Sequence, residues 1–157
     1  RLVIKKEALN IKKVIENAVI GLAPGAEAKG LRVVSKIDKN LPRVIGDDDR
    51  LTEVLNNLLG NSIKYTDEGQ ILVEGKLEGN FVKVAVTDTG IGIPKLHLRK
   101  IFEKFYRGDE SLARVAGGTG LGLAIAKGII SVLEGQIWAE SEGEGRGTSF
   151  IFTIPIV

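Results

Sequence analysis

The sequence predicts an α+β fold built as a two-layer sandwich, in which a mixed, mostly antiparallel sheet of about five strands packs against about three helices. Hairpins and separate helices follow one another along the chain, in place of the strict strand–helix alternation that is typical of parallel sheets. Two strand-like segments, 70–77 and 81–88, are separated by a short turn and should form an antiparallel hairpin. The length of 157 residues suits one domain over 1–157 with a substantial core.

The composition of the chain excludes several kinds of site. Cysteine is absent, which removes disulfides, thiolate metal sites and cysteine nucleophiles. The 22 lysines and arginines nearly balance 20 acidic residues, and no basic run with interleaved aromatics occurs, so we expect no nucleic-acid partner. No apolar run is long enough to span a bilayer, so we expect no direct membrane insertion. Because methionine is also absent and the chain opens on Arg1, we expect a piece of a longer protein.

Short elements are predicted ahead of the central helix. A strand is expected at 2–4, and apolar residues at helical spacing predict a helix over 9–22. Pro24 and Gly25 should end that helix. β-Branched segments then predict two strands, 31–37 and 43–45.

The stretch from Asp49 to Thr66 predicts the central helix of the fold. Aspartates at 47–49 supply candidate N-caps and negative charge at the positive end of the helix. One side of this helix is apolar, and a second stripe consists of Glu53, Asn57, Asn61 and Lys64. Asparagine is a mediocre helix former, so two of them one turn apart are either part of a solvated face or aimed at a ligand.

The second half of the chain carries further helices and strands. A short helix is expected at 96–105 and a mobile loop at 106–118. A longer helix is predicted over 121–133, with Gly135 as its C-terminal stop, followed by strands at 136–140 and 148–154.

Two glycine-containing segments could carry chemistry. Asp88-Thr89-Gly90-Ile91-Gly92 ends a buried strand, where a carboxylate can accept a hydrogen bond from an exocyclic amine and glycine allows a flat ligand to approach the backbone. A tight turn made for backbone reasons is the alternative. The segment 117–123 precedes a helix, whose N-terminal N–H groups and partial positive charge favour a phosphate. It matches neither a P-loop nor a Rossmann turn, and a hinge before a helix is its alternative.

Together these segments resemble the nucleotide-binding domain shared by sensor histidine kinases, DNA gyrase, the heat-shock ATPase chaperones and the MutL repair ATPases. Five motifs occur in family order: NNLLGNSIKYT resembles the N box, DTGIGI the first glycine box, FEKFYR the F box, GGTGLGL the second glycine box, and GRGTSF a final strand element. The F box and NLLGNSIKYT favour the histidine-kinase branch. Residues 1–8 resemble the junction that leaves a kinase dimerisation helix. The resemblance implies a Bergerat-type sandwich in a cytoplasmic catalytic domain.

The resemblance also implies a site for ATP and Mg²⁺. Asp88 would accept from the adenine amino group, with help from Thr148 through water, while Asn61 and Asn57 would ligate the metal ion. Catalytic roles fall to Asn57, Lys64 and Arg107, of which the last two would contact phosphate. The remaining nucleotide contacts would come from Tyr65, Gly90, Gly92, Ile93, Gly118, Thr119, Gly120, Leu121, Gly122 and Leu123. Phe102 and Phe105 would anchor the loop that follows the F box.

The amide at position 57 bears on the reaction. The resemblance implies that the related ATPases have, at the equivalent position, a glutamate that takes a proton from the attacking water. An amide cannot take up that proton. Hydrolysis should therefore be poor, which suits a kinase whose γ-phosphate must reach a protein nucleophile. Glu53 lies one turn earlier and could replace the base, although a structural role is the simpler expectation.

These residues predict a protein-histidine kinase of a two-component system. The lone histidine, His97, lies between the first glycine box and the F box, where the family has no phosphoacceptor, so we expect a surface or packing role for it. The phosphoacceptor histidine would lie on the parent's own dimerisation domain, and a response regulator would act downstream. The alternatives are a related protein-serine kinase, a hydrolysing ATPase of the same fold, and a degenerate nucleotide-binding scaffold.

Overall fold

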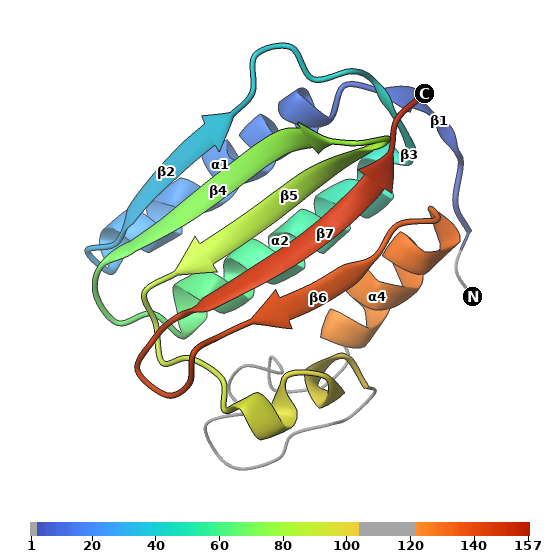
Figure 1. Cartoon of the computed structure of the whole chain (residues 1–157). Helices are drawn as coiled ribbons and strands as arrows, with labels where there is room; N and C mark the ends of the chain where they lie inside the picture. Colours follow the sequence, from blue (N-terminus) through green and yellow to red (C-terminus); the bar gives the residue numbers. More distant parts are fainter. Residues whose placement is uncertain (1–2, 104–121) are drawn as a thin grey trace.

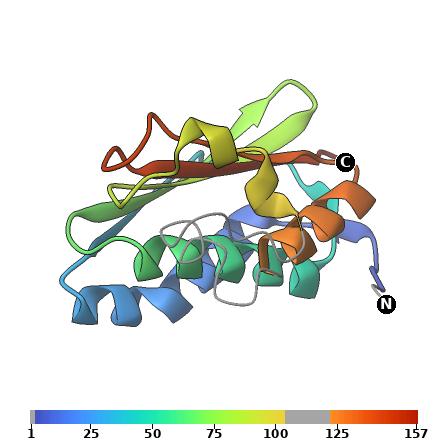
Figure 2. The same ribbon diagram turned by 90° about the horizontal axis from the view of Figure 1, so that it is seen from below.

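The computed structural model of the chain describes residues 3–103 and 122–157 and has two layers (Figures 1 and 2). One layer is a five-stranded sheet in the order β2-β4-β5-β7-β6, and the helices of the described residues cover one of its faces. The strands of this sheet are β2 (Arg32–Ile37), β4 (Gln70–Glu78), β5 (Phe81–Asp88), β6 (Ile137–Glu140) and β7 (Thr148–Pro155). The helices are α1 (Ile11–Ala28), α2 (Asp48–Lys64) and α4 (Gly122–Val132). The predicted α+β sandwich is confirmed.

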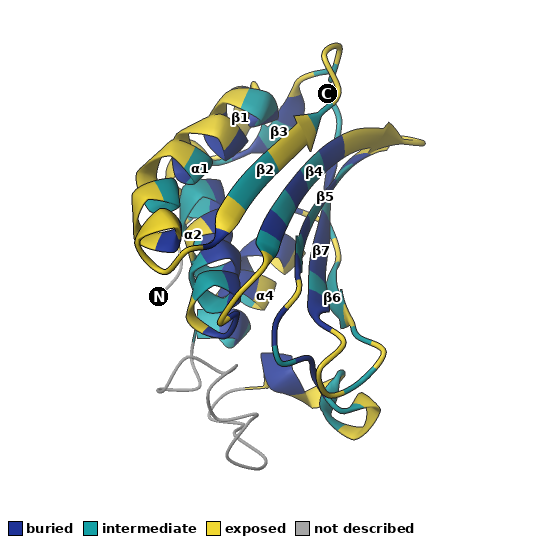
Figure 3. Cartoon of the chain, turned by 90° about the vertical axis from the view of Figure 1, so that its left-hand side faces the viewer, coloured by how far each residue is buried: buried dark blue, intermediate teal, exposed yellow. Residues whose placement is uncertain are grey.

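The sheet is mixed and mostly antiparallel. Strands β4 and β5 form the predicted hairpin, and β7 pairs antiparallel with both β5 and β6. Only β2 and β4 run parallel in this sheet, with Arg32 opposite Gln70. Along β5, Val82, Val84 and Val86 are fully buried against the helical layer, while the residues between them face the opposite side of the sheet. Figure 3 shows how burial follows from this alternation.

Helix α2 is the central helix of the covering layer, as predicted. Asp47 is its N-cap, and its carboxylate accepts a hydrogen bond from the Arg50 N–H at 3.1 Å. The apolar side of the helix, which includes Leu51, Leu55 and Leu58, is fully buried between the sheet and its neighbours α1 and α4. Its polar stripe is therefore left at the margin of the core, beside the start of α4.

The prediction of a strand at 2–4 is wrong for its described residues. The first strand is β1 (Glu7–Leu9), which pairs antiparallel with β3 (Val44–Gly46) in a separate small sheet. The Leu9 side chain is buried in the core there, which explains why pairing occurs at this point. The segment before β1 is held by a side chain instead, since the Lys5 N–H donates to Asp47 at 2.8 Å.

The expectation that Pro24 and Gly25 end the first helix is also wrong. Helix α1 continues through both residues to Ala28. A proline at this position leaves the carbonyl of Ile20 without its helical partner. Ile20 is exposed, so water can bind that carbonyl, while Ala26 beyond the proline is fully buried and holds the last turn against the core.

Two further boundaries differ from expectation. In place of a helix over 96–105, the described residues form two 3-10 turns, η1 (Lys95–His97) and η2 (Lys100–Phe102). After α4, the left-handed residue is Glu134, with φ 64°, and not Gly135. Gly135 is needed for a different reason, because a Cβ there would collide with the carbonyl oxygen of Thr153.

Candidate functional site

The candidate site lies where the ends of β5 and β7 meet the polar stripe of α2. Asp88 is the last residue of β5 and Thr148 is the first of β7, and the two are opposite each other in the sheet. A narrow cavity of about 10 Å³ is lined by Asn61 and Tyr65 from the α2 end and by Asp88, Ile91, Gly92, Thr148 and Phe150. That volume is close to what one water molecule needs.

Asp88 is a buried carboxylate with a constrained geometry. One of its oxygens, Oδ1, accepts hydrogen bonds from the N–H of Gly90 at 2.9 Å and from the N–H of Thr148 at 3.1 Å. Burial raises the pKa of the Asp88 carboxyl above its ordinary value, and hydrogen bonds from the Gly90 N–H, the Ser62 hydroxyl and the Thr148 N–H offset only part of that effect. Two lone pairs on one oxygen are thus committed to the backbone, and Oδ2 is left to accept from a ligand.

Two buried hydroxyls lie in the same region. Ser62 Oγ and Thr66 Oγ1 are both buried; the Ser62 hydroxyl interacts with the Asp88 carboxylate and lowers its pKa, while Thr66 Oγ1 has no hydrogen-bond partner within the part of the chain that the structure describes. Thr66 Oγ1 is adjacent to the glycine loop, since a Cβ at Gly90 would lie 2.7 Å from it. Buried hydroxyls normally find partners, so the Thr66 hydroxyl indicates room for ordered water or for polar atoms of a ligand beside Asp88.

The loop 88–92 is fixed by the turn that precedes β7. Gly145 N donates to Ile91 O at 2.6 Å, and Gly147 N donates to Gly90 O at 3.2 Å. Gly92 has φ 74°, and a Cβ on it would collide with the carbonyl oxygen of Gly143. The glycines at 90 and 92 are therefore explained first by close packing within the protein, in addition to any ligand that approaches the loop.

The polar stripe of α2 has three distinct environments. Glu53 forms an ion pair with Arg50, at 3.0 Å between Oε1 and the guanidinium. Asn57 faces the start of α4, because a Cβ at Gly122 would lie 3.0 Å from Asn57 Oδ1. Asn61 lines the cavity, and the ammonium of the exposed Lys64 lies 5.3 Å from the centre of the Tyr65 ring.

The structure brings together several of the residues predicted to bind nucleotide. Asn61, Tyr65, Asp88, Gly92 and Thr148 share one cavity, and Asn57 and Gly122 adjoin each other nearby. Ile93 and Leu123 are buried in the core instead, and the Ile93 N–H donates to Ser141 Oγ at 3.0 Å. Arg107, Gly118, Thr119, Gly120 and Leu121 lie outside the described residues, as does Phe105. The nucleotide contacts of all these residues stay predictions.

Four residues of the site were not predicted from the sequence. Ile91 and Phe150 line the cavity, and Ser62 and Thr66 provide its buried hydroxyls. Ser62 and Thr66 are four residues apart on the otherwise apolar side of the central segment. In the sequence, two hydroxyl residues at that spacing on a core-facing stripe were the pattern that could have indicated a polar site.

The donor set fits a purine nucleotide with a hard cation. A free carboxylate oxygen and nearby hydroxyls suit an exocyclic amine and a bridging water, while Tyr65 and Ile91 offer apolar and aromatic walls. Neutral amide oxygens from Asn57 and Asn61 suit Mg²⁺ whose charge is balanced by phosphates.

Over the described ranges, no cluster of three or more histidine, cysteine or acidic side chains offers another metal site. Within the same ranges no helix is both long and apolar enough to cross a bilayer.

Residues 46–157 match a family model described as the histidine kinase-, DNA gyrase B- and HSP90-like ATPase. Among individual proteins, the chain is 45% identical over 112 residues to the sensor histidine kinase WalK of Bacillus subtilis, covering 69% of this chain and 18% of that protein. It is 36% identical over 160 residues to the histidine-protein kinase BarA of Escherichia coli, covering 98% of this chain and 17% of BarA. The chain thus spans less than a fifth of these relatives.

Solved structures resemble the fold as well. The catalytic domain of the histidine kinase ThkA superposes with a TM-score of 0.84 at 29% identity, covering 97% of this chain and 98% of that one. Full-length ShkA, crystallised in complex with AMPPNP, gives a TM-score of 0.86 at 28% identity over 99% of this chain and 32% of its own. ThkA has also been crystallised in complex with the response regulator TrrA, with a TM-score of 0.81, 29% identity and coverage of 99% and 43%.

Proposed function

This chain belongs to the histidine kinase-, DNA gyrase B- and HSP90-like ATPase family, in its sensor histidine kinase branch, and from that membership we propose that it binds Mg²⁺-ATP and phosphorylates a histidine. The acceptor would lie on a dimerisation domain of the parent protein. A response regulator would then receive the phosphoryl group, which is supported by the crystallised pair of ThkA with TrrA.

The observation that carries the proposal is the buried carboxylate of Asp88. Its Oδ1 is held by two backbone N–H groups, so its position is fixed before any ligand binds. A fixed acceptor beside buried hydroxyls, in a cavity walled by Tyr65 and Ile91, suits the amino edge of adenine. The AMPPNP complex of ShkA supports an adenine nucleotide for this fold.

The polar stripe of α2 would hold the other end of the nucleotide. Asn61 and Asn57 present neutral oxygens to Mg²⁺, and Lys64 contributes a positive charge for phosphate. The ion, when bound, would neutralise charge on the transferred phosphoryl group. The contact between Asn57 and Gly122 supports a role for the first turn of α4, whose N-terminus adds partial positive charge next to this stripe.

The same stripe favours transfer to protein over hydrolysis. Asn57 has no basic group that could take a proton from water. Glu53, the other candidate base, is engaged by Arg50 at 3.0 Å, and this ion pair supports a structural role for it.

The test is to mix the purified chain with a dimerisation hairpin that bears the phosphoacceptor histidine and with radiolabelled ATP. We expect acid-labile, base-stable label on the hairpin, dependent on Mg²⁺. Asp88→Asn should abolish the label by removing nucleotide affinity, which calorimetry with ADP measures separately. Label that survives acid would indicate a serine kinase, and steady phosphate release that Glu53→Ala abolishes would indicate an ATPase.

A further inference from the structure

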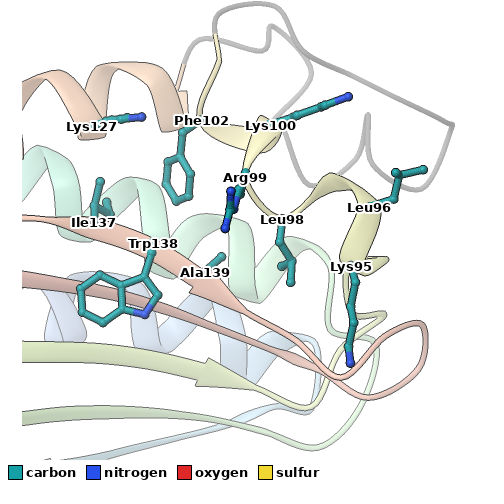
Figure 4. Close-up of a pocket in the computed structure, with 10 residues that line it drawn as sticks. All are labelled: Lys95, Leu96, Leu98, Arg99, Lys100, Phe102, Lys127, Ile137, Trp138 and Ala139. Atoms are coloured by element: carbon teal, nitrogen blue, oxygen red, sulfur yellow. The ribbon is translucent and has the colours of Figure 1, made fainter.

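A second cavity, of about 700 Å³, lies at the edge of the sheet formed by β6. Side chains from the two 3-10 turns, from α4 and from β6 surround it (Figure 4). None of its described lining residues lines the cavity at Asp88. It is therefore a separate site, and its occupant need not be the nucleotide.

The cavity exposes the unpaired edge of β6. Three consecutive residues, Ile137, Trp138 and Ala139, line it, whereas a cavity over one face of a strand would be lined by alternate residues. In the described part of the sheet β6 pairs with β7 alone. Thr153 N donates to Gln136 O at 2.9 Å, so by alternation the backbone groups of Trp138 face β7. Those of Ile137 and Ala139 then face the cavity.

The walls of this cavity combine apolar and basic side chains. Phe102 is buried beside Ile137, and Leu96 near the opening is 75% exposed. Four cations surround this apolar surface: Lys95, Arg99, Lys100 and Lys127. The described lining contains no acidic residue, although acidic and basic residues nearly balance over the whole sequence. The local excess of positive charge therefore calls for an anionic occupant.

We propose that this cavity docks an extended acidic segment of another polypeptide, which pairs with the free edge of β6 and alternates apolar with acidic side chains. Its backbone would bond to the exposed groups of Ile137 and Ala139. Its apolar side chains would cover Phe102 and Ile137 on one face of the added strand, and its carboxylates would meet basic lining residues such as Arg99 on the other face. A nucleic acid would use the cations but neither the strand edge nor the apolar side chains, so the full set of features favours a polypeptide.

The test uses a short blocked peptide in which glutamate and valine alternate. Trp138 is the one tryptophan of the chain, so its fluorescence reports directly on this cavity. We expect saturable quenching or enhancement on titration, with NMR shifts at the amides of Ile137 and Ala139. A peptide with lysine in place of glutamate, and one with proline in place of the central valine, should each bind at least about tenfold more weakly.

Variants separate docking from general electrostatics. Arg99→Glu together with Lys127→Glu should weaken peptide binding by at least about tenfold, while Lys12→Glu on α1 with Lys39→Glu in the loop after β2, a pair of equal charge change, should not. Both double variants should bind ADP with the same affinity in calorimetry, which keeps the result for the peptide independent of the nucleotide site. The proposal is overturned if the peptide leaves Trp138 unchanged at about millimolar concentration, or if the proline peptide binds as well as the parent.

Discussion

Gly122 and Asn57 lie against each other: a Cβ on Gly122 would be 3.0 Å from the side-chain oxygen of Asn57. The first residue of α4 thereby limits where the amide of the α2 stripe can point. Since the same amide is a proposed metal ligand, the position of Gly122 and that of the ligand are linked by direct contact.

Gly122→Ala should therefore lower Mg²⁺-ATP affinity more than it lowers stability. The added methyl forces the Asn57 side chain to shift by a few tenths of an ångström, and we expect affinity to fall roughly three- to tenfold. Calorimetry with AMPPNP and Mg²⁺ measures the effect. Gly128→Ala in the same helix is the control, because nothing lies within 4 Å of its Cβ, and there helix propensity should raise stability by about 0.5 kcal/mol. Equal affinity in the two variants would contradict the link.

Asp88 should make both stability and binding depend on pH, with opposite signs. Its pKa is raised in the folded state, so folding takes up a proton between the ordinary carboxyl pKa and the raised one. The stability that Asp88 contributes is full below its unfolded pKa and is lost as pH rises through the folded pKa. Nucleotide binding needs the ionised acceptor, so affinity should rise over that same window. Asp88→Asn should flatten the stability profile in thermal melts and remove binding; an unchanged profile would show that another group titrates.

Lys29, at the end of α1, should help to hold the end of α2. Its ammonium donates to Ile63 O at 2.6 Å and to Lys64 O at 3.3 Å, where the helix leaves carbonyls without helical partners. Lys29→Met should cost about 0.5 kcal/mol in denaturant unfolding, less at high salt because the site is exposed. Lys39→Met, an exposed lysine between β2 and β3, is the matched control. A loss that does not change with salt would argue against a charge effect.

The sequence predicted the elements whose pattern is local and missed those that depend on tertiary contacts. The alternation of Val82, Val84 and Val86 and the two stripes of α2 were sufficient to predict a hairpin and a central helix. Pro24 was expected to end α1, because the burial of Ala26 that retains the last turn cannot be read from neighbouring residues. Gly135 is required because a side chain there would collide with the carbonyl oxygen of Thr153, and Thr153 belongs to a strand that comes later in the chain.

The residues of the candidate site also differ in how far the sequence alone could indicate them. Asp88 and the asparagine stripe stood out in the sequence as a carboxylate after a buried strand and amides on a helix, while their roles toward a nucleotide came from the resemblance and stay predictions. The hydroxyls of Ser62 and Thr66 did not, since they acquire a role only when the fold buries them beside Asp88 and Gly90.

The exposed side of α4 should dock the phosphoacceptor helix. Ile125 and Val132 are 40% and 46% exposed, and they lie two turns apart with Gly128 between them, which forms an apolar stripe that another helix can approach closely. Ile125→Glu should reduce phosphotransfer to a separate dimerisation hairpin by at least about tenfold and leave ADP affinity unchanged. Ile20→Glu on α1 is the control, since Ile20 is 71% exposed and lies on a different helix. Equal loss in both variants would indicate a general effect of the charge.

Asn57→Glu should convert part of the transfer activity into hydrolysis. A carboxylate at this position can accept a proton from water beside the γ-phosphate, and a positioned general base contributes roughly 10²- to 10⁴-fold. Because Gly122 confines the side chain, we expect an effect at the lower end of that range, about 10²-fold more phosphate release by the chain alone and a fall in label on the acceptor histidine. Asn57→Gln is the matched control, as it has the same length without a base. If both variants release phosphate equally slowly, the amide at this position does not decide between water and protein as the phosphoryl acceptor.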